Sequence, residues 1–340
     1  MTNMIRKLYL SHSDDPFENL SIENQFLNTI SNNEEILFLY SNRPCIVMGR
    51  FQNIYEECNL SLMVSSEVQL VRRQSGGGCV YHDLGNLNFS FIHHGRDHKK
   101  ESNHELILKA LSSFGINAYA SGRSDLVIDR EKLTKKFSGS AFKQKKSCSF
   151  HHGTLLFNTD LDKLNAYLKP KSYHVHSKSI KSVRSSVINL SELGSINKDD
   201  FIDILSSLYL SNQKMKSPLQ TTSHDVDHDY YKLITSDQWI IGENPKTKLN
   251  LEEKDLDVEV NLVKGRIDSL EPNSQTLNII ELNHICDFFK GCLISEDSLR
   301  AKYEAYKLDF SGESLEAKTL FELLMSISIQ KFFLKLKKEG

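Results

Sequence analysis

Residues 72–86, RRQSGGGCVYHDLGN, combine residue types that bind anions. The three consecutive glycines at 76–78 allow positive φ and a close approach of the backbone to a ligand. Successive backbone N–H groups in such a turn can surround an anion, and the two arginines before it add fixed charge and paired donors. A glycine-rich hairpin that binds nothing is the alternative. The spacing matches neither a P-loop nor a Rossmann fingerprint, so it predicts neither of those nucleotide sites.

A second cluster surrounds the small-residue segment FSGSA at 137–141. Seven basic residues and one acidic residue lie between 130 and 146. A run of this kind is usually a solvated surface, and that interpretation stays open. Because small residues let a ligand approach the backbone, Lys136 could instead point inward while its neighbours face water. An inward lysine can bridge a phosphate and a carboxylate.

Two pairs of adjacent histidines, at 93–94 and 151–152, raise the question of a metal. Adjacent residues of a strand point to opposite faces, which is poor geometry for one zinc ion. The second pair is better explained if one member forms a hydrogen bond within a site. His174 and His176 could share a strand face, but they lie in a polar segment and we expect them to be solvated.

The composition limits the class of protein. A chain of 340 residues with 39% hydrophobic residues can form one large domain or two. A net charge of −2 argues against a generally basic nucleic-acid binder. Six cysteines without C-x-x-C spacing predict reduced thiols. No apolar run approaches the ~20 residues of a membrane helix and no signal peptide is evident, so we expect a soluble, intracellular protein.

Alternating strand and helix signals fill the first two hundred residues. Apolar residues at helical spacing predict a helix over 18–30, with Asn19 or Asp15 as its cap. Two apolar runs within 36–49, broken by Ser-Asn-Arg-Pro, predict a pair of strands. The strand that enters the glycine loop is expected at 68–75, and the strand that leaves it at 87–94. The remaining expected elements are a helix over 105–116 and strands at 125–129 and 151–161.

The alternation of strand and helix signals stops around 211–229, and this segment divides the chain. We predict a catalytic domain over 1–215, a linker over 216–230 and an accessory domain over 231–340. In the last of these, alternation about a Lys-Gly turn predicts a β-hairpin within 256–272. Three helices should follow, near 278–291, 295–306 and 315–337.

Several of these segments resemble one family, lipoate–protein ligase A. They are RRQSGGGCVYHDLGNLNFSF from residue 72, KFSGSAF from 136, FHHGTLLFN from 150 and SVRSSVINL from 182. DPFENLSIEN and MGRFQNIYEECN near the N-terminus also match the family pattern. The resemblance covers about residues 8–195 strongly and continues more weakly into the C-terminal part. The GRGRxG motif of the related biotin ligases does not occur, which favours the lipoate branch.

The resemblance implies an α+β fold of the biotin/lipoate ligase type, with a mixed sheet and helices, plus a smaller α/β accessory domain. Such enzymes use ATP and Mg²⁺ to activate lipoate, or octanoate, as lipoyl-AMP. They then pass the acyl group to a lysine of a lipoyl carrier domain, in E2 subunits of 2-oxoacid dehydrogenases or in the H protein of glycine cleavage. The resemblance also implies a monomer that binds no nucleic acid or membrane, cytoplasmic or, in a eukaryote, in the mitochondrial matrix.

The family's functional residues transfer by motif. Lys136 is the expected catalytic residue and should bind both the acyl carboxylate and the α-phosphate. Asp125 should lie near the ribose and the Mg²⁺, which would be held mainly by phosphate oxygens and water, so no protein metal motif is predicted. His82 and His152 are candidates for orienting groups. The expected ATP and lipoyl-AMP site consists of Arg73, Ser75, Gly76, Gly77, Gly78, Cys79, Val80, Tyr81, Asn86, Asp125, Lys136, Ser138 and Ala141.

One position departs from the family pattern and keeps other functions open. Cys79 stands where a small residue such as Ala or Thr is usual. A buried small thiol is the simple explanation. A nucleophile would instead suit a lipoyl- or octanoyltransferase of the same fold that forms no adenylate, and Cys148 raises the same question. A binding module without catalysis is the third alternative, against which the intact glycine loop and Lys136 argue.

Overall fold

A computed structural model describes residues 4–66, 68–122, 124–170, 175–211, 213–214, 217–253, 256–310 and 314–328. The chain forms two compact units, each made of three segments. Unit 1 consists of Met1–Val47, Arg73–Leu164 and Val183–Lys232, and unit 2 of Met48–Arg72, Asn165–Ser182 and Leu233–Gly340. The domain bounds expected from the sequence stay a prediction.

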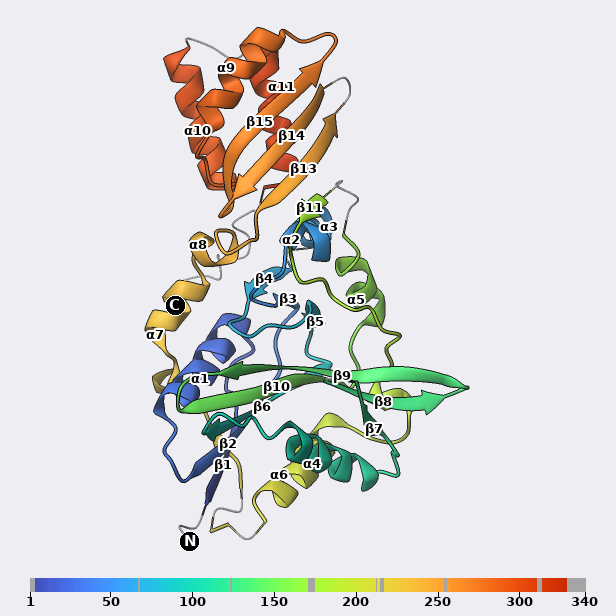
Figure 1. Ribbon diagram of the computed structural model, residues 1–340. Helices are drawn as coiled ribbons and strands as arrows, with labels where there is room; N and C mark the ends of the chain where they lie inside the picture. Colours follow the sequence, from blue (N-terminus) through green and yellow to red (C-terminus); the bar gives the residue numbers. More distant parts are fainter. Residues whose placement is uncertain are drawn as a thin grey trace. The chain divides into compact units, whose positions relative to one another are not determined.

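Unit 1 is built on a mixed eight-stranded sheet (Figure 1) with the strand order β12-β1-β2-β6-β10-β9-β8-β7. β1 runs parallel to both of its neighbours, and all other pairs are antiparallel. The mixed sheet with helices confirms the α+β class. The strands are β1 (Ile5–Leu10), β2 (Glu34–Tyr40), β6 (Asn86–His94), β7 (Tyr119–Ser121), β8 (Asp125–Arg130), β9 (Leu133–Gln144), β10 (Cys148–Leu156) and β12 (Leu219–Gln220).

Each face of this sheet has its own hydrophobic core. On one face, Phe89 and Phe91 of β6 pack with residues of α4 (Lys100–Ser112) and α6 (Lys198–Tyr209). On the other face, Ile92 of β6 and Phe150 of β10 pack with α1 (Pro16–Thr29). Both faces of β6 are therefore buried, including the polar side chains of Asn88 and Ser90 that alternate with its apolar residues.

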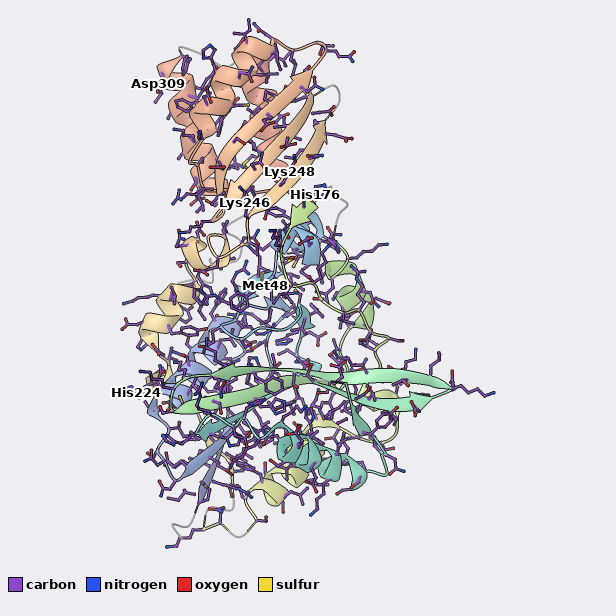
Figure 2. The ribbon with its side chains drawn as sticks, in the orientation of Figure 1. Met48, His176, His224, Lys246, Lys248 and Asp309 are labelled. Carbon is purple, nitrogen blue, oxygen red and sulfur yellow. The ribbon has the colours of Figure 1, made fainter. Side chains whose placement is uncertain are left out.

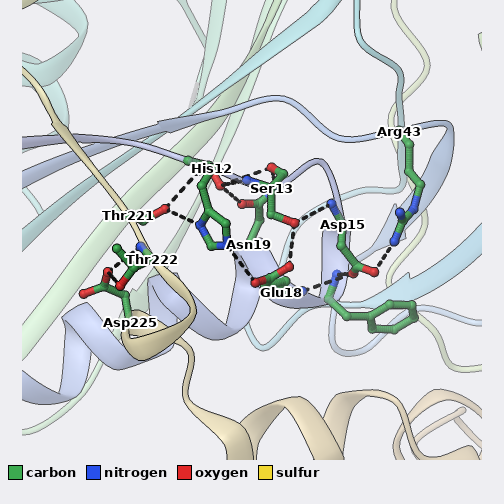
Figure 3. Close-up of polar contacts among 11 residues, drawn as sticks. His12, Ser13, Asp15, Glu18, Asn19, Arg43, Thr221, Thr222 and Asp225 are labelled. Carbon is green, nitrogen blue, oxygen red and sulfur yellow. Dashed lines mark hydrogen bonds and ion pairs between the residues drawn. The ribbon is translucent and has the colours of Figure 1, made fainter. Parts of the chain in front are cut away.

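The predicted helix near residues 18–30 is α1, and Asp15 is its cap. The Asp15 carboxylate accepts from the backbone N–H groups of Phe17 and Glu18, and Pro16 occupies the first helical position. Figure 3 shows this cap together with the ion pair between Asp15 and Arg43. The cap fixes where α1 begins, and thereby which of its side chains face the sheet.

The two strands predicted within 36–49 form, but they do not pair with each other. β2 lies between β1 and β6, whereas β3 (Cys45–Met48) pairs with β5 (Val80–His82). The intervening turn leaves the sheet because Asn42 is buried there, between the side chains of Asn19 and His82. Pairing partners depend on such long-range contacts, which a local pattern does not contain.

The other helices and strands predicted in the first two hundred residues also form, but they begin or end a few residues away from the predicted positions. α4 begins at Lys100, five residues before its expected start, and ends at Ser112, shortly before Gly115 with its φ of +74°. The expected linker contains β12, which pairs with β1, a 3₁₀ turn (Ser223–Asp225) and the start of α7 (His228–Ile234). Of the described helices, none is both long and apolar enough to cross a membrane.

Unit 2 contains an antiparallel sheet in the order β11-β13-β14-β15. The predicted hairpin is confirmed as β14 and β15, with Lys264 and Gly265 at positive φ in its turn. His176 lies on β11 opposite Lys248 (Figure 2) and is exposed, whereas His174 lies outside the described residues. The strands are β11 (Val175–Ser177), β13 (Thr247–Glu253), β14 (Leu256–Val263) and β15 (Arg266–Ser274).

All three predicted C-terminal helices occur in unit 2, as α9 (Ile279–Phe289), α10 (Glu296–Asp309) and α11 (Leu315–Ser326). The expected continuation of the last one to 337 lies beyond the described residues. The segments of unit 2 that come from earlier in the chain supply shorter elements. These are α2 (Ile54–Glu57), α3 (Leu60–Ser65) and β4 (Gln69–Arg72), followed later by α8 (Asp237–Ile240).

Candidate functional site

Arg73 holds the glycine loop in shape from the inside. Its buried guanidinium donates from Nη2 to the carbonyl oxygens of Gly76 at 2.6 Å and Gly78 at 2.8 Å. Nη1 donates to the Val47 carbonyl at 3.0 Å, and Nε donates to Ser75 Oγ at 2.9 Å. Burial lowers the pKa of Arg73 to about 10, so the group stays charged at neutral pH. The main role of the Arg73 guanidinium in this structure is therefore to hold the loop in its shape through these hydrogen bonds.

This arrangement turns backbone donors outward. In a trans peptide the N–H points away from the preceding carbonyl, so the Gly77 N–H points away from the guanidinium that binds the Gly76 carbonyl. Gly77 is exposed at a φ of +90°, and a Cβ there would lie 2.9 Å from Arg73 Nη2 and 3.2 Å from the Ala141 Cβ. Only glycine fits this position, and the loop can offer backbone N–H groups to an anion.

Arg72 has a different role from its neighbour, and the expectation that both arginines supply charge to the loop is wrong for it. Its fully buried guanidinium lies within unit 2 and donates to the carbonyls of Ile240 at 2.9 Å and Gln52 at 2.9 Å. It also reaches Asn244 Oδ1 at 3.3 Å. Strand alternation separates the two side chains, and Arg72 ties together segments that are distant in sequence.

A buried hydrogen-bonded chain extends from the loop to α1. Ser75 Oγ lies 2.8 Å from His152 Nε2, and His152 Nδ1 lies 2.8 Å from Glu23 Oε1. Glu23 is only 1% exposed and Ser75 is equally buried. Because Ser75 also accepts from Arg73, the chain links the α1 carboxylate to the group that shapes the loop. Such a network rigidifies its members when every polar group is paired.

Lys136 lies on β9 at a bulge, where the pairing with β8 shifts between Leu126 and Val127. Its ammonium is 2.8 Å from Asp125 Oδ1, and both side chains are partly exposed. A Cβ built on Gly139 would lie 2.9 Å from Lys136 Nζ, so the absent side chain at 139 provides the space for the ammonium. The lysine therefore presents a partly exposed charge beside a carboxylate.

The structure brings this ammonium and the glycine loop to one face of β9. Gly139 and Ala141 are two residues apart on the strand, so both face the same side. The Lys136 ammonium lies over the first and Gly77 over the second. His152 pairs with Ala141 across the ladder and shares this face, which we call the loop face. Backbone donors and one partly exposed positive charge thus converge there.

His151 points the other way, as expected for adjacent residues on a strand. Its ring stacks on Phe142 with centroids 4.7 Å apart and contacts His104 at 4.9 Å. Asn103 Nδ2 lies 3.2 Å from its Nδ1. Burial lowers the pKa of His151 to about 2, so the ring is neutral in a hydrophobic core. Of the two histidines, only His152 reaches the candidate site.

The other predicted site residues are less accessible. Asn86 is fully buried and donates to Asn88, so it is turned into the fold. His82 lies 3.0 Å from the Asn42 amide, and burial lowers its pKa to about 3, which makes it neutral. The remaining members are buried or half-buried in the loop or on adjoining strands: Cys79, Val80, Tyr81 and Ser138. Their proposed contacts with a ligand stay predictions.

The second candidate nucleophile, Cys148, packs in the core beneath α1 with Ile92 and Phe150. Position 79 is the cysteine that lies in the loop itself, and its side chain is buried. Among the described residues, no group of three or more His, Cys, Asp or Glu side chains could hold a metal ion.

Two residues of the site were missed by the sequence argument, Glu23 and Gly139. A carboxylate among the apolar residues that α1 buries was the available signal for Glu23. Gly139 lies within the FSGSA segment, but its function depends on the position of the Lys136 side chain.

The backbone of Lys136 is hydrogen-bonded to the segment that follows residue 182. Lys136 N donates to Ser186 O at 2.9 Å, and Ile188 N donates to Lys136 O at 3.0 Å.

Comparisons with known proteins identify the family to which the chain belongs. The family model for the lipoyl protein ligase A/B catalytic domain matches residues 15–208, more than half of the chain. LipL1 of P. falciparum in complex with lipoate is similar in structure, with 28% identity and a TM-score of 0.61 over 93% of this chain and 99% of that one.

Two further structures share the fold. A bipartite lipoate protein ligase from Thermoplasma acidophilum, studied with its E2 lipoyl domain, has 23% identity and a TM-score of 0.60 over 70% of this chain and 96% of that one. A lipoate-protein ligase A bound with ATP has 24% identity and a TM-score of 0.58 over 69% of this chain and 98% of that one. With a matched catalytic domain and this fold, the chain belongs to the lipoyl protein ligase A/B family.

Proposed function

We propose that the protein is an ATP-dependent lipoate–protein ligase. It activates lipoate, or octanoate, as lipoyl-AMP and transfers the acyl group to a lysine of a lipoyl carrier domain, in E2 subunits or the H protein. The observation that carries this proposal is the convergence of the Lys136 ammonium and the Gly77 loop on the loop face of β9. Similar proteins have been seen with lipoate, with ATP and with an E2 lipoyl domain, which supports each substrate.

In the first step the lipoate carboxylate attacks the α-phosphorus of ATP, and the bond to the β-phosphate oxygen breaks to release pyrophosphate. Two anions must meet, so the site has to offset negative charge before and during the reaction. Lys136 can move from Asp125 to the junction of carboxylate and phosphate, while the outward Gly77 N–H binds a phosphate oxygen. Asp125 would hold the Mg²⁺ that accompanies ATP, which further neutralises phosphate charge.

In the second step the ε-amine of the acceptor lysine attacks the acyl carbonyl of lipoyl-AMP. The acyl–oxygen bond to AMP breaks, the new amide forms, and the amine loses a proton. Lys136 stays positioned to stabilise the phosphate of the departing AMP. No thiol takes part in either step, so the mechanism makes no demand on Cys79.

The test separates the two steps on an apo lipoyl domain, with intact mass as the readout. Wild-type enzyme with lipoate, ATP and Mg²⁺ should add one lipoyl group, and synthetic lipoyl-AMP alone should do the same. Transfer from lipoyl-AMP without any transfer from ATP and lipoate would contradict the ligase and favour the transferase. Failure of both donors would contradict acyl attachment altogether.

Cys79 is the observation that favours a second candidate, a transferase that forms a thioester. Its thiol is buried within the glycine loop, in which Arg73 binds the carbonyl oxygens of Gly76 and Gly78. Cys79→Ala distinguishes the two functions. We expect the variant to keep lipoyl transfer within a few-fold of wild type, because a small apolar side chain fills the same position. Complete loss of transfer in a folded Cys79→Ala protein would support the thioester.

A further inference from the structure

A buried glutamate on α1 is paired with a histidine of β10, and no step of the proposed reaction uses it. Glu23 Oε1 lies 2.8 Å from His152 Nδ1, and both residues belong to unit 1. Both side chains are buried. A carboxylate that is removed from water needs hydrogen-bond donors, and His152 Nδ1 supplies one. The pair therefore restricts which nitrogen of the His152 ring carries a hydrogen.

The hydrogen bonds from Glu23 to Arg73 have one direction that pairs every polar hydrogen. An ionised carboxylate only accepts, so His152 Nδ1 carries a hydrogen and donates it to Glu23. Arg73 Nε only donates, so Ser75 Oγ accepts from it. The Ser75 hydroxyl then donates its own hydrogen to His152 Nε2, 2.8 Å away. This last bond requires a neutral ring without a hydrogen on Nε2.

A ring with a hydrogen on Nε2 leaves the Ser75 hydroxyl unpaired. Such a ring donates to Ser75 Oγ, which then accepts from both His152 and Arg73. In the part of the chain that the structure describes, the hydroxyl hydrogen of Ser75 has no third acceptor, and the side chain is buried. Since a buried hydroxyl without an acceptor is costly, Ser75 would turn and Arg73 Nε would lose its acceptor. Glu23 excludes the neutral tautomer of this kind, because its carboxylate accepts a hydrogen from Nδ1 and offers none.

The same turn of α1 holds the glycine loop at a second point. Gln74 Nε2 donates to Asn24 Oδ1 at 3.0 Å. Arg73 is also bonded to the Val47 carbonyl. The loop therefore stays attached when the Glu23 contact is lost. A change at Glu23 acts on the direction of the hydrogen bonds rather than on the fold of the loop.

We propose that Glu23 is a positioning residue for adenylation, an inference that rests on the proposed function. It keeps the ring hydrogen of His152 on Nδ1, so that the Ser75 hydroxyl accepts from Arg73 Nε. The guanidinium then stays aligned with the loop carbonyls that it binds, and the Gly77 N–H stays turned outward. A loop that already has this shape binds a phosphate of ATP with less ordering on association.

Two measurements on Glu23→Ala test the inference. NMR of the protein with ¹⁵N-labelled histidine at pH 8 shows which ring nitrogen of His152 carries the hydrogen, and a His152→Phe sample assigns its signals. Lipoate-dependent ATP–pyrophosphate exchange gives the KM for ATP and kcat. In wild type the hydrogen should lie on Nδ1. In Glu23→Ala it should move, wholly or in part, to Nε2, and the KM for ATP should rise about tenfold with kcat within about threefold of wild type.

Glu23→Gln is the second variant and keeps the test decisive if Glu23→Ala does not fold. Its side chain has the same size, and its amide can either accept from Nδ1 of His152 or donate to it. The KM for ATP should follow the ring hydrogen. A hydrogen on Nε2 should be accompanied by the raised KM, and a hydrogen on Nδ1 by the wild-type KM. A mismatch in either direction overturns the positioning role.

Glu18→Ala is the matched control, because Glu18 also lies on α1 and also pairs with a histidine. Its carboxylate binds the Ser13 hydroxyl and lies 3.0 Å from His12 Nε2 rather than at the glycine loop (Figure 3). This variant should keep the hydrogen of His152 on Nδ1 and the wild-type KM for ATP. Equal changes in Glu18→Ala and Glu23→Ala would show a general effect of α1, which overturns the specific role of Glu23.

The remaining outcomes separate this inference from the proposed function. A wild-type hydrogen on Nε2, or an unchanged ring in Glu23→Ala, overturns the positioning role while the ligase stands. A lower kcat with a wild-type KM, as partial unfolding alone would produce, does the same. A wild-type protein without lipoate-dependent exchange overturns the ligase and with it the role in adenylation, wherever the ring hydrogen lies.

Discussion

The two faces of the β9–β10 pair in unit 1 differ sharply in chemistry. On the loop face, His152 joins Glu23 to Ser75, and the Lys136 ammonium lies over Gly139. On the opposite face, His151 stacks on Phe142 among the aromatic residues beneath α4 and α6. One strand pair therefore supplies both a charged site and a hydrophobic core.

This difference shows that residue type alone does not identify a functional histidine. Both histidines are buried, and they are neighbours in sequence. What separates them is the side to which each points, and hence whether a carboxylate or a ring lies next to it. The same comparison explains why Lys136 is placed for chemistry: its ammonium lies on the face on which the backbone donors of the loop are available.

The largest effect is expected from Lys136→Ala, which removes the positive charge from the loop face. Lipoylation of a carrier domain should fall by about 10²–10³-fold or more, as when one preorganised transition-state donor is removed. Lys135→Ala is the matched control, because that side chain binds Ser186 Oγ on the surface and should retain near wild-type activity. Equal losses in the two variants would show that Lys136 has no special role.

The next largest effect is expected for the adjacent histidines His151 and His152, and it concerns the free energy of unfolding. His152→Phe leaves the buried Glu23 without its partner and should cost about 3 kcal/mol of unfolding free energy. His151→Phe replaces a neutral ring in an aromatic environment, and Asn103 keeps its bond to the His98 carbonyl, so the cost should stay below about 1 kcal/mol. Urea denaturation at pH 7 measures both. Similar values would contradict the distinction between the faces.

Gly139→Ala should reduce activity without unfolding the protein. The added methyl group would displace the Lys136 ammonium, which is the flexible end of a long side chain, so stability should change little. Misplacing a catalytic group by about 1 Å can cost up to 10²-fold, and we expect a loss of about 10–100-fold in lipoylation. Gly194→Ala, where a Cβ meets no atom within 4 Å, controls for the substitution itself.

The smallest expected effect is a pH dependence of the unfolding free energy, caused by His151 on the face opposite the loop face. Burial lowers the pKa of His151 to about 2, whereas in the unfolded chain it titrates near 6.5. Below pH 6.5 the unfolded state binds the additional proton, so stability falls as the pH falls. Between pH 7 and pH 5 wild type should lose about 2 kcal/mol more unfolding free energy than His151→Phe. Parallel pH profiles in urea denaturation would show that His151 is protonated in the folded state.

Local patterns in the sequence predicted much of the fold and part of the site. The glycine loop, the helix capped at Asp15 and the hairpin turn at Lys264 depend on residues close together in the chain. Strand partners, the role of Arg72 and the link from Glu23 to His152 depend on residues far apart. The last is a contact across 129 positions, and no periodicity in either segment indicates the other.

The proposal that the loop face forms an adenylate is tested most directly by isotope exchange between ATP and pyrophosphate in the wild-type protein. No carrier domain is needed, so the measurement concerns the first step alone. The account predicts rapid incorporation of labelled pyrophosphate into ATP that requires both lipoate and Mg²⁺. Incorporation that is absent, or that proceeds equally well without lipoate, would contradict it.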